Sequence, residues 1–294
     1  MSISQAMSFK AQAEQKQKGG LMSLFSGGAK YDEAADLYLK AANQFKLMKD
    51  WQNAADCFAS FASCSAKAGM PTDEANGYVE AARCLKNISA NEALFWFDKA
   101  TSILSGAGRF TQAAKILKEV AEIHESEAQP KKAAEFYQKA EDMFSMDEHS
   151  KSQVTACILK RAELIADNGE LLEAAQLFEK EGEKALMNPM LQFGAREHFL
   201  KAGILYLALG DPVTAKVACE RFHQRDPRLE GTREGKLLKG LTAAFSENDL
   251  ESFRDKLAEY DQVTRLDDWK AKHLLSVVSK MEAPEAAEAE VDFS

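Results

Sequence analysis

A short motif recurs along the chain at intervals of about 20 residues, and it constrains the fold more than any other feature. In each copy, alanine is followed a few residues later by an aromatic or large apolar residue. Because residues i and i+4 share one face of a helix, the alanine admits a neighbouring helix and the larger side chain fills the space beside it. A single such helix cannot bury this face, so the motif predicts stacked helices. The copies begin at Tyr31, Trp51, Asp73, Asn91, Thr111, Lys131 and Leu172.

The residues between the copies predict where each helix ends. Glycine and proline terminate helices, and most of the predicted breaks contain one or both. The wider gap before the last copy predicts one additional helix without the motif. A helix pair of about 40 residues is close in length to a tetratricopeptide repeat. The predicted breaks are Gly69-Met70-Pro71, Gly106-Ala107-Gly108, Gln129-Pro130, Asn168-Gly169, Asn188-Pro189 and Gly210-Asp211-Pro212.

The fold class follows from these patterns. Good helix formers dominate the composition, and no stretch alternates between apolar and polar residues as a strand would. We therefore expect an all-α protein, a tetratricopeptide-like helical-hairpin solenoid in which antiparallel helices form a twisted sheet, capped by a C-terminal helical bundle. The predicted regions are 1–30 (N-terminal helix and loop), 31–228 (solenoid), 229–281 (helical bundle, with helices near 231–245, 248–262 and 267–281) and 282–294 (flexible acidic tail).

Charge and cysteine content exclude several classes of protein. The 37 basic and 46 acidic side chains give a net charge of −9, which argues against a generally basic nucleic-acid binder. No run of apolar residues is long enough to span a membrane, and the N-terminus does not have the pattern of a secretory signal. The five cysteines form no CxxC pair, so reduced thiols and a cytoplasmic location are expected.

Catalytic motifs are not found. The five histidines lie outside metal-ligand spacings, and Gly231–Leu237 resembles a phosphate-binding loop only faintly, with the wrong spacing and no preceding strand. Buried cysteines on apolar helix faces are usually inert. We therefore expect no enzyme activity, no cofactor and no metal, and favour a binding scaffold.

Two segments suggest contacts with partners. The Gly/Ser-rich stretch 19–28 holds Leu21, Met22, Leu24 and Phe25, flanked by lysines, and favours weak, reversible contact with a membrane. The alternative is that this loop packs onto the solenoid. The chain ends in Glu290-Val291-Asp292-Phe293-Ser294, where one apolar residue lies in an acidic tail. Such a tail either docks on a partner or only increases solubility.

A set of bases is the third feature. On one concave face these side chains would bind a long acidic rod, whereas scattered over the surface they would be ordinary solvated charges. The residues are Lys49, Lys86, Arg109, Lys115, Lys160, Arg196 and Arg233.

Several segments, taken in order, resemble the soluble NSF attachment protein family over nearly the whole chain. The run Glu259–Trp269 is the most specific of them. The others are Leu21–Gly28, Lys49-Asp50-Trp51, Gly108–Lys115 and Thr232–Leu238. The sequence departs from the family pattern at Ala156, Ala243 and Ser246, at Phe293 in place of a leucine, and in the loop, where Phe25 is the only aromatic residue.

The resemblance implies an adaptor that binds the SNARE four-helix bundle (syntaxin-type, synaptobrevin-type and SNAP-25-type chains) and recruits and stimulates the AAA+ ATPase NSF, in several copies per bundle. It implies that the seven bases face the SNAREs and that the loop at 21–25 attaches peripherally to membranes during vesicle-mediated transport and fusion. The residues implied to face the NSF hexamer are Asp211, Glu247, Asp249, Glu290, Asp292 and Phe293. Two rival interpretations are a tetratricopeptide-type scaffold for short peptides and an enzyme.

Overall fold

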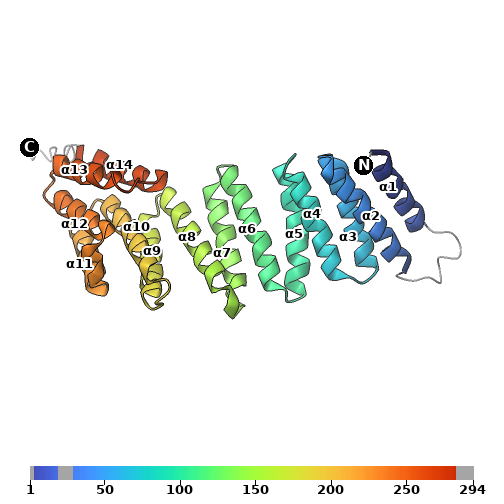
Figure 1. The fold of residues 1–294 in the computed structure, drawn as a ribbon, viewed down its shortest axis with the longest axis horizontal. Coiled ribbons are helices and arrows are strands. Elements are labelled where there is room, and N and C mark those ends of the chain that lie inside the picture. Colours follow the sequence, from blue (N-terminus) through green and yellow to red (C-terminus); the bar gives the residue numbers. More distant parts are fainter. Residues whose placement is uncertain (1–2, 19–28, 283–294) are drawn as a thin grey trace, which may run out of the picture. The chain divides into compact units, whose positions relative to one another are not determined.

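The computed structural model describes residues 3–18 and 29–282, and all regular structure within these ranges is helical (Figure 1). This confirms the all-α prediction. None of the described helices is long and apolar enough to cross a bilayer. The helices are α1 (Ile3–Lys18), α2 (Ala29–Leu47), α3 (Trp51–Lys67), α4 (Pro71–Leu85), α5 (Ala90–Gly106), α6 (Phe110–Ser126), α7 (Pro130–Phe144), η2 (Glu148–Ser150), α8 (Lys151–Asp167), α9 (Leu171–Leu186), η3 (Gln192–Gly194), α10 (Ala195–Leu209), α11 (Pro212–Arg225), η4 (Pro227–Gly231), α12 (Arg233–Ser246), α13 (Leu250–Asp261) and α14 (Asp268–Glu282).

The chain divides into two compact units, Met1–Cys157 and Ile158–Ser294, and the boundary falls within α8. Each unit is described by itself. The first contains α1 to α7 and the start of α8, and the second contains the rest of α8 and α9 to α14. The region boundaries at 30, 228 and 281 stay predictions.

The first unit is a helical-hairpin solenoid, as the repeat predicts. From α1 to α7 each helix packs against the next one in the chain, and the helices run in alternating directions (Figure 1). The motif alanines Ala34, Ala54 and Ala113 are fully buried, so neighbouring helices meet at these positions. The aromatic residues Phe58 and Tyr137 are buried beside them and fill the remaining space.

Glycines end two helices of this unit at positions where an L side chain would be strained. Gly69 and Gly108 have φ values of +77° and +70°, in the left-handed region that favours glycine. The turns after α2, α4 and α6 lie at one edge of the solenoid, hereafter the first edge, because successive helices alternate in direction. The turns after α3 and α5 lie at the opposite, second edge.

The second unit is organised around α10. This helix packs against α9, α11, α12 and α14, and it is buried on nearly all sides, including Phe199 and Ile204. Gly203 allows the close approach of α12, because a Cβ atom there would lie 2.3 Å from Leu238 Cδ1. The three helices predicted after residue 231 are confirmed as α12, α13 and α14. They form a bundle with α10 and not one further pair of the repeat.

Buried polar contacts anchor α14. The Lys270 ammonium group is almost fully buried and lies 2.6 Å from Glu197 and 2.9 Å from Asp267. The Trp269 indole donates a hydrogen bond to the Glu163 backbone oxygen at 3.3 Å. Such contacts add little net stability, but loss of both carboxylates would leave the buried Lys270 charge uncompensated. These contacts therefore specify where α14 docks.

Candidate interaction surfaces

The four predicted bases of the first unit lie at two edges and one helix face. Lys49 is in the turn after α2 and Lys86 caps the end of α4, so both lie at the first edge. Arg109 precedes α6 at the second edge, and Lys115 lies on the exposed stripe of α6. The structure therefore distributes these charges across the solenoid and does not gather them at one point.

All four side chains are exposed, and no carboxylate among the described residues forms an ion pair with any of them. Their hydrogen-bonding capacity is therefore directed at solvent. Lys49 also has a positive φ of 59°, an uncommon conformation for a residue with a side chain. Charges that are exposed and not internally neutralised remain available to an acidic partner.

Two other bases, on α2 and α4, form ion pairs with carboxylates of neighbouring helices. Lys46 on α2 contacts Glu80 on α4, and Arg83 on α4 contacts both Glu80 and Glu119 on α6. Burial alone would raise the pKa of Glu80, but hydrogen bonds from Lys46 and Arg83 outweigh it and lower the pKa below 4.5. This chain of charges, hereafter the Lys46–Glu119 ladder, joins α2, α4 and α6. Sequence reasoning did not identify it.

The predicted bases of the second unit have more internal contacts. Lys160 lies 3.8 Å from Glu163, and Arg196 lies 3.8 Å from Glu234. Arg233 donates a hydrogen bond to the Thr264 hydroxyl at 3.1 Å. The side chains of Lys160 and Arg196 are about half exposed, so their contacts are loose surface pairs worth about 0.2–1 kcal/mol each.

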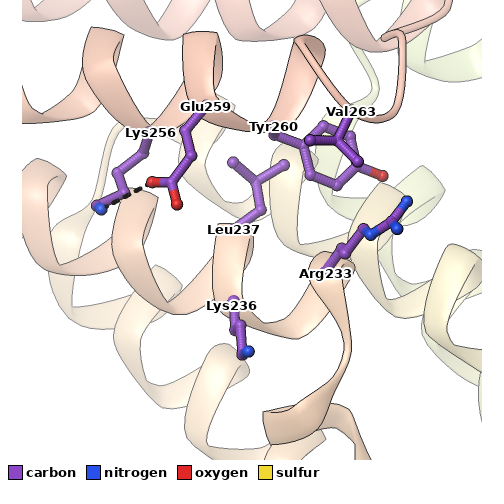
Figure 2. Close-up of a pocket in the computed structure, with 7 residues that line it drawn as sticks. All are labelled: Arg233, Lys236, Leu237, Lys256, Glu259, Tyr260 and Val263. Carbon is purple, nitrogen blue, oxygen red and sulfur yellow. Dashed lines mark hydrogen bonds and ion pairs between the residues drawn. The ribbon is translucent and has the colours of Figure 1, made fainter.

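Arg233 lines a cavity of about 380 Å³ between α12 and α13 (Figure 2). Leu237 and Tyr260 are buried on its apolar side, and burial raises the pKa of the Tyr260 phenol. Lys256 turns toward Glu259, with 3.1 Å between the charged groups. Lys236 contributes a further base. The cavity thus combines three cations and one carboxylate with an apolar surface formed by Leu237 and Tyr260. This combination suits a partner that presents an acidic side chain next to an apolar group.

The three predicted acids that the structure describes lie at one end of the α11–α12 pair. Asp211 precedes α11, whereas Glu247 and Asp249 lie in the turn after α12. The short η4 segment joins α11 to α12, and Cys219 of α11 lies near both Lys239 and Thr242 of α12, so the two helices pack as antiparallel neighbours. The start of α11 and the end of α12 therefore meet. The structure thus brings Asp211 to the same end as Glu247 and Asp249, which lie far from it in the sequence.

Two of these acids also cap helices. The Asp211 carboxylate accepts hydrogen bonds from the Thr214 hydroxyl and the Val213 amide, which lower its pKa. The Asp249 carboxylate accepts a hydrogen bond from the Ser252 amide at 2.9 Å. Glu247 is exposed, and no side-chain contact of it is seen within residues 29–282. A carboxylate that caps a helix remains negatively charged, so both roles are compatible.

The remaining predicted contact residues fall outside the described ranges. These are Leu21, Met22, Leu24, Phe25, Glu290, Asp292 and Phe293.

Within the described ranges, no group of three or more His, Cys, Asp and Glu side chains could hold a metal ion. The five cysteines are unpaired and buried, and burial raises the pKa of the Cys57 thiol to about 11.

Comparison with known proteins extends over nearly the whole chain. A family model described as soluble NSF attachment protein, SNAP, matches residues 4–282. An alpha-soluble NSF attachment protein of Vitis vinifera is 36% identical over 286 residues, which cover 97% of each chain. The protein of that name from Homo sapiens is 32% identical over 285 residues, covering 96% of each chain. A probable vesicular-fusion protein sec17 homolog of Neurospora crassa is 37% identical, covering 90% of this chain and 89% of its own.

Proposed function

The chain belongs to the soluble NSF attachment protein family, and from this premise we propose that it is an adaptor for SNARE disassembly. In this proposal it binds assembled SNARE complexes and recruits and stimulates NSF, which hydrolyses ATP. The adaptor itself does not hydrolyse ATP. The observation that carries the proposal is the family match across residues 4–282, which includes both the solenoid and the bundle.

The seven bases would contact the acidic SNARE bundle. Lys49, Lys86, Arg109 and Lys115 support this proposal because they are exposed and not ion-paired within the described residues. Each exposed contact contributes only about 0.2–1 kcal/mol, so affinity would come from many weak contacts and several adaptor copies. Binding would therefore weaken steeply as salt screens the charges.

The acids at the α11–α12 end would face NSF. Asp211, Glu247 and Asp249 are exposed at that end, and Glu290, Asp292 and the apolar Phe293 of the C-terminal segment would add to the same contact. The segment 21–25 would attach the protein peripherally to membranes from the cytoplasm. In this arrangement one acidic region contacts the ATPase while bases contact the SNAREs.

A charge-reversal pair tests the proposed SNARE contact. Lys115→Glu with Lys160→Glu should strongly reduce recovery of SNARE bundles in a pull-down, because each substitution replaces attraction with repulsion. Lys132→Glu with Lys216→Glu is the matched control, since both lysines are exposed, lie one in each unit and are outside the predicted set. Equal recovery with both pairs would mean that the face is wrongly assigned. If the protein bound short peptides but no SNARE bundle, the tetratricopeptide-type scaffold would be favoured.

A further inference from the structure

The connection between α9 and α10 displays the most exposed apolar side chains of the described residues. Met190 and Met187 are 89% and 84% exposed, and Leu191 and Phe193 are also well exposed. We call residues 187–194 the methionine loop. Scattered exposed apolar residues are ordinary, whereas four large ones within seven consecutive residues form a patch that indicates an interaction site.

Hydrogen bonds hold the methionine loop in this exposed conformation. The Asn188 carboxamide oxygen accepts a hydrogen bond from the Met190 amide at 3.0 Å, and the Asn188 carbonyl accepts one from the Leu191 amide at 2.9 Å. The Gln192 carboxamide donates to the Pro189 carbonyl at 3.0 Å. Because the backbone is already ordered, little further conformational entropy would be lost on binding.

Three cations outside the predicted SNARE-contact set lie beside the loop, and each is more exposed than the acid that it contacts. Lys184, at the end of α9, is 49% exposed while its partner Glu181 is 2% exposed. Arg228 is 55% exposed against 8% for Asp226, and it also donates a hydrogen bond to Gln192 in the loop. The same asymmetry holds for Arg225, which is 48% exposed against 27% for Glu183. In these pairs the more accessible charge is therefore positive, although each pair is neutral overall.

We propose that the methionine loop binds the surface of an anionic phospholipid bilayer. The four apolar side chains would enter the interface between headgroups and acyl chains, and the surrounding cations would contact the phosphates. A uniformly acidic protein surface would satisfy the cations and leave the apolar side chains in water. An apolar groove would bury the side chains and leave the cations without partners. A bilayer with acidic lipids offers both environments at one surface.

This site is separate from segment 21–25 and does not depend on the proposed adaptor role. All measurements are therefore made on the full chain carrying Leu24→Ser and Phe25→Ser, so that the other predicted membrane segment does not contribute. Vesicles of phosphatidylcholine alone are compared with vesicles that also contain phosphatidylserine. Both vesicle types are tested at low and at high salt.

The first measurement places an environment-sensitive fluorophore on Met190→Cys. The five native cysteines are buried, so labelling is selective for the new thiol. Phosphatidylserine vesicles should shift the emission to the blue, and salt should reverse part of the shift. A label on Val213→Cys, which is 70% exposed in the same unit, should not shift. An unshifted label at position 190, or equal shifts at both positions, would overturn the proposal.

The second measurement removes the apolar side chains and uses no label. Met190→Ser with Phe193→Ser should lower the fraction that floats with phosphatidylserine vesicles by at least about threefold. Val213→Ser with Val217→Ser should leave that fraction unchanged, because it removes two exposed apolar side chains outside the loop. Matched melting temperatures would show that both variants are folded. Equal flotation of the two pairs would contradict the proposal.

Discussion

The guanidinium group of Arg83 on α4 donates hydrogen bonds to both carboxylate oxygens of Glu119 on α6, from Nε at 3.1 Å and from Nη2 at 2.5 Å. The two helices are separated in the chain by α5, so this contact joins alternate helices of the solenoid. A two-pronged arginine–carboxylate contact fixes orientation as well as distance. The Lys46–Glu119 ladder therefore fixes the relative spacing of α2, α4 and α6.

The ladder predicts a specific loss of stability in acid. Because the folded-state pKa of Glu80 is lowered from 4.5, its contribution is present above the unfolded-state pKa and is lost as the pH falls through the folded-state value. Glu80→Gln should therefore lower the free energy of unfolding near neutral pH. The expected decrease is about 1 kcal/mol at most, because solvent partly screens these exposed charges. Urea titrations between neutral and acidic pH should show the difference from the parent protein closing in acid. A constant difference across that range would contradict the ladder.

The packing of α10 gives a second prediction. Gly203→Ala would place a Cβ atom 2.3 Å from Leu238 Cδ1, so α12 or the leucine must shift, at a cost of about 1–3 kcal/mol. Gly106→Ala is the control, because Gly106 also lies in a helix and its Cβ atom would meet nothing within 4 Å. Thermal unfolding should show a lowered Tm for the first variant only. Equal Tm values would mean that α12 does not pack closely at Gly203.

The fold of the first unit could be predicted from the sequence because each helix packs mainly against the next helix in the chain. Motif alanines such as Ala54 mark helix contacts, and Gly69 marks a turn that needs a positive φ. Contacts such as Arg83 with Glu119 depend on how two non-consecutive helices align, which spacing along the chain does not specify. The position of Asp211 near Glu247 likewise depends on how α11 and α12 pack, and not on spacing along the chain. The methionine loop was recognised only as a break at Asn188-Pro189, because exposure depends on what packs nearby.

The segment at 21–25 gives a prediction that separates membrane contact from SNARE binding. Leu24→Ser with Phe25→Ser should slow NSF-driven disassembly of SNARE complexes on liposomes, because serine side chains would not enter the bilayer. Disassembly of the same complexes lacking membrane anchors should proceed at the parent rate. If both rates fell equally, the segment would act on the SNAREs or NSF and not on the membrane.

The acidic terminus is expected to act on the ATPase alone. Deletion of Phe293 and Ser294 removes the apolar residue of the tail and leaves the seven bases intact. SNARE binding in a pull-down should be unchanged, whereas the increase in NSF ATPase rate should fall. Unchanged stimulation would argue against docking of the terminus on NSF, and lost SNARE binding would assign it a different role.

The central claim, that the chain couples SNARE complexes to NSF, is tested most directly by reconstituted disassembly. A purified SNARE complex is incubated with NSF and ATP, with and without this protein, and separation of the SNARE chains is followed by fluorescence. Rapid separation only when the protein, NSF and ATP are all present is the predicted result. Separation at the same rate without the protein, or ATP hydrolysis by the protein alone, would contradict the adaptor role.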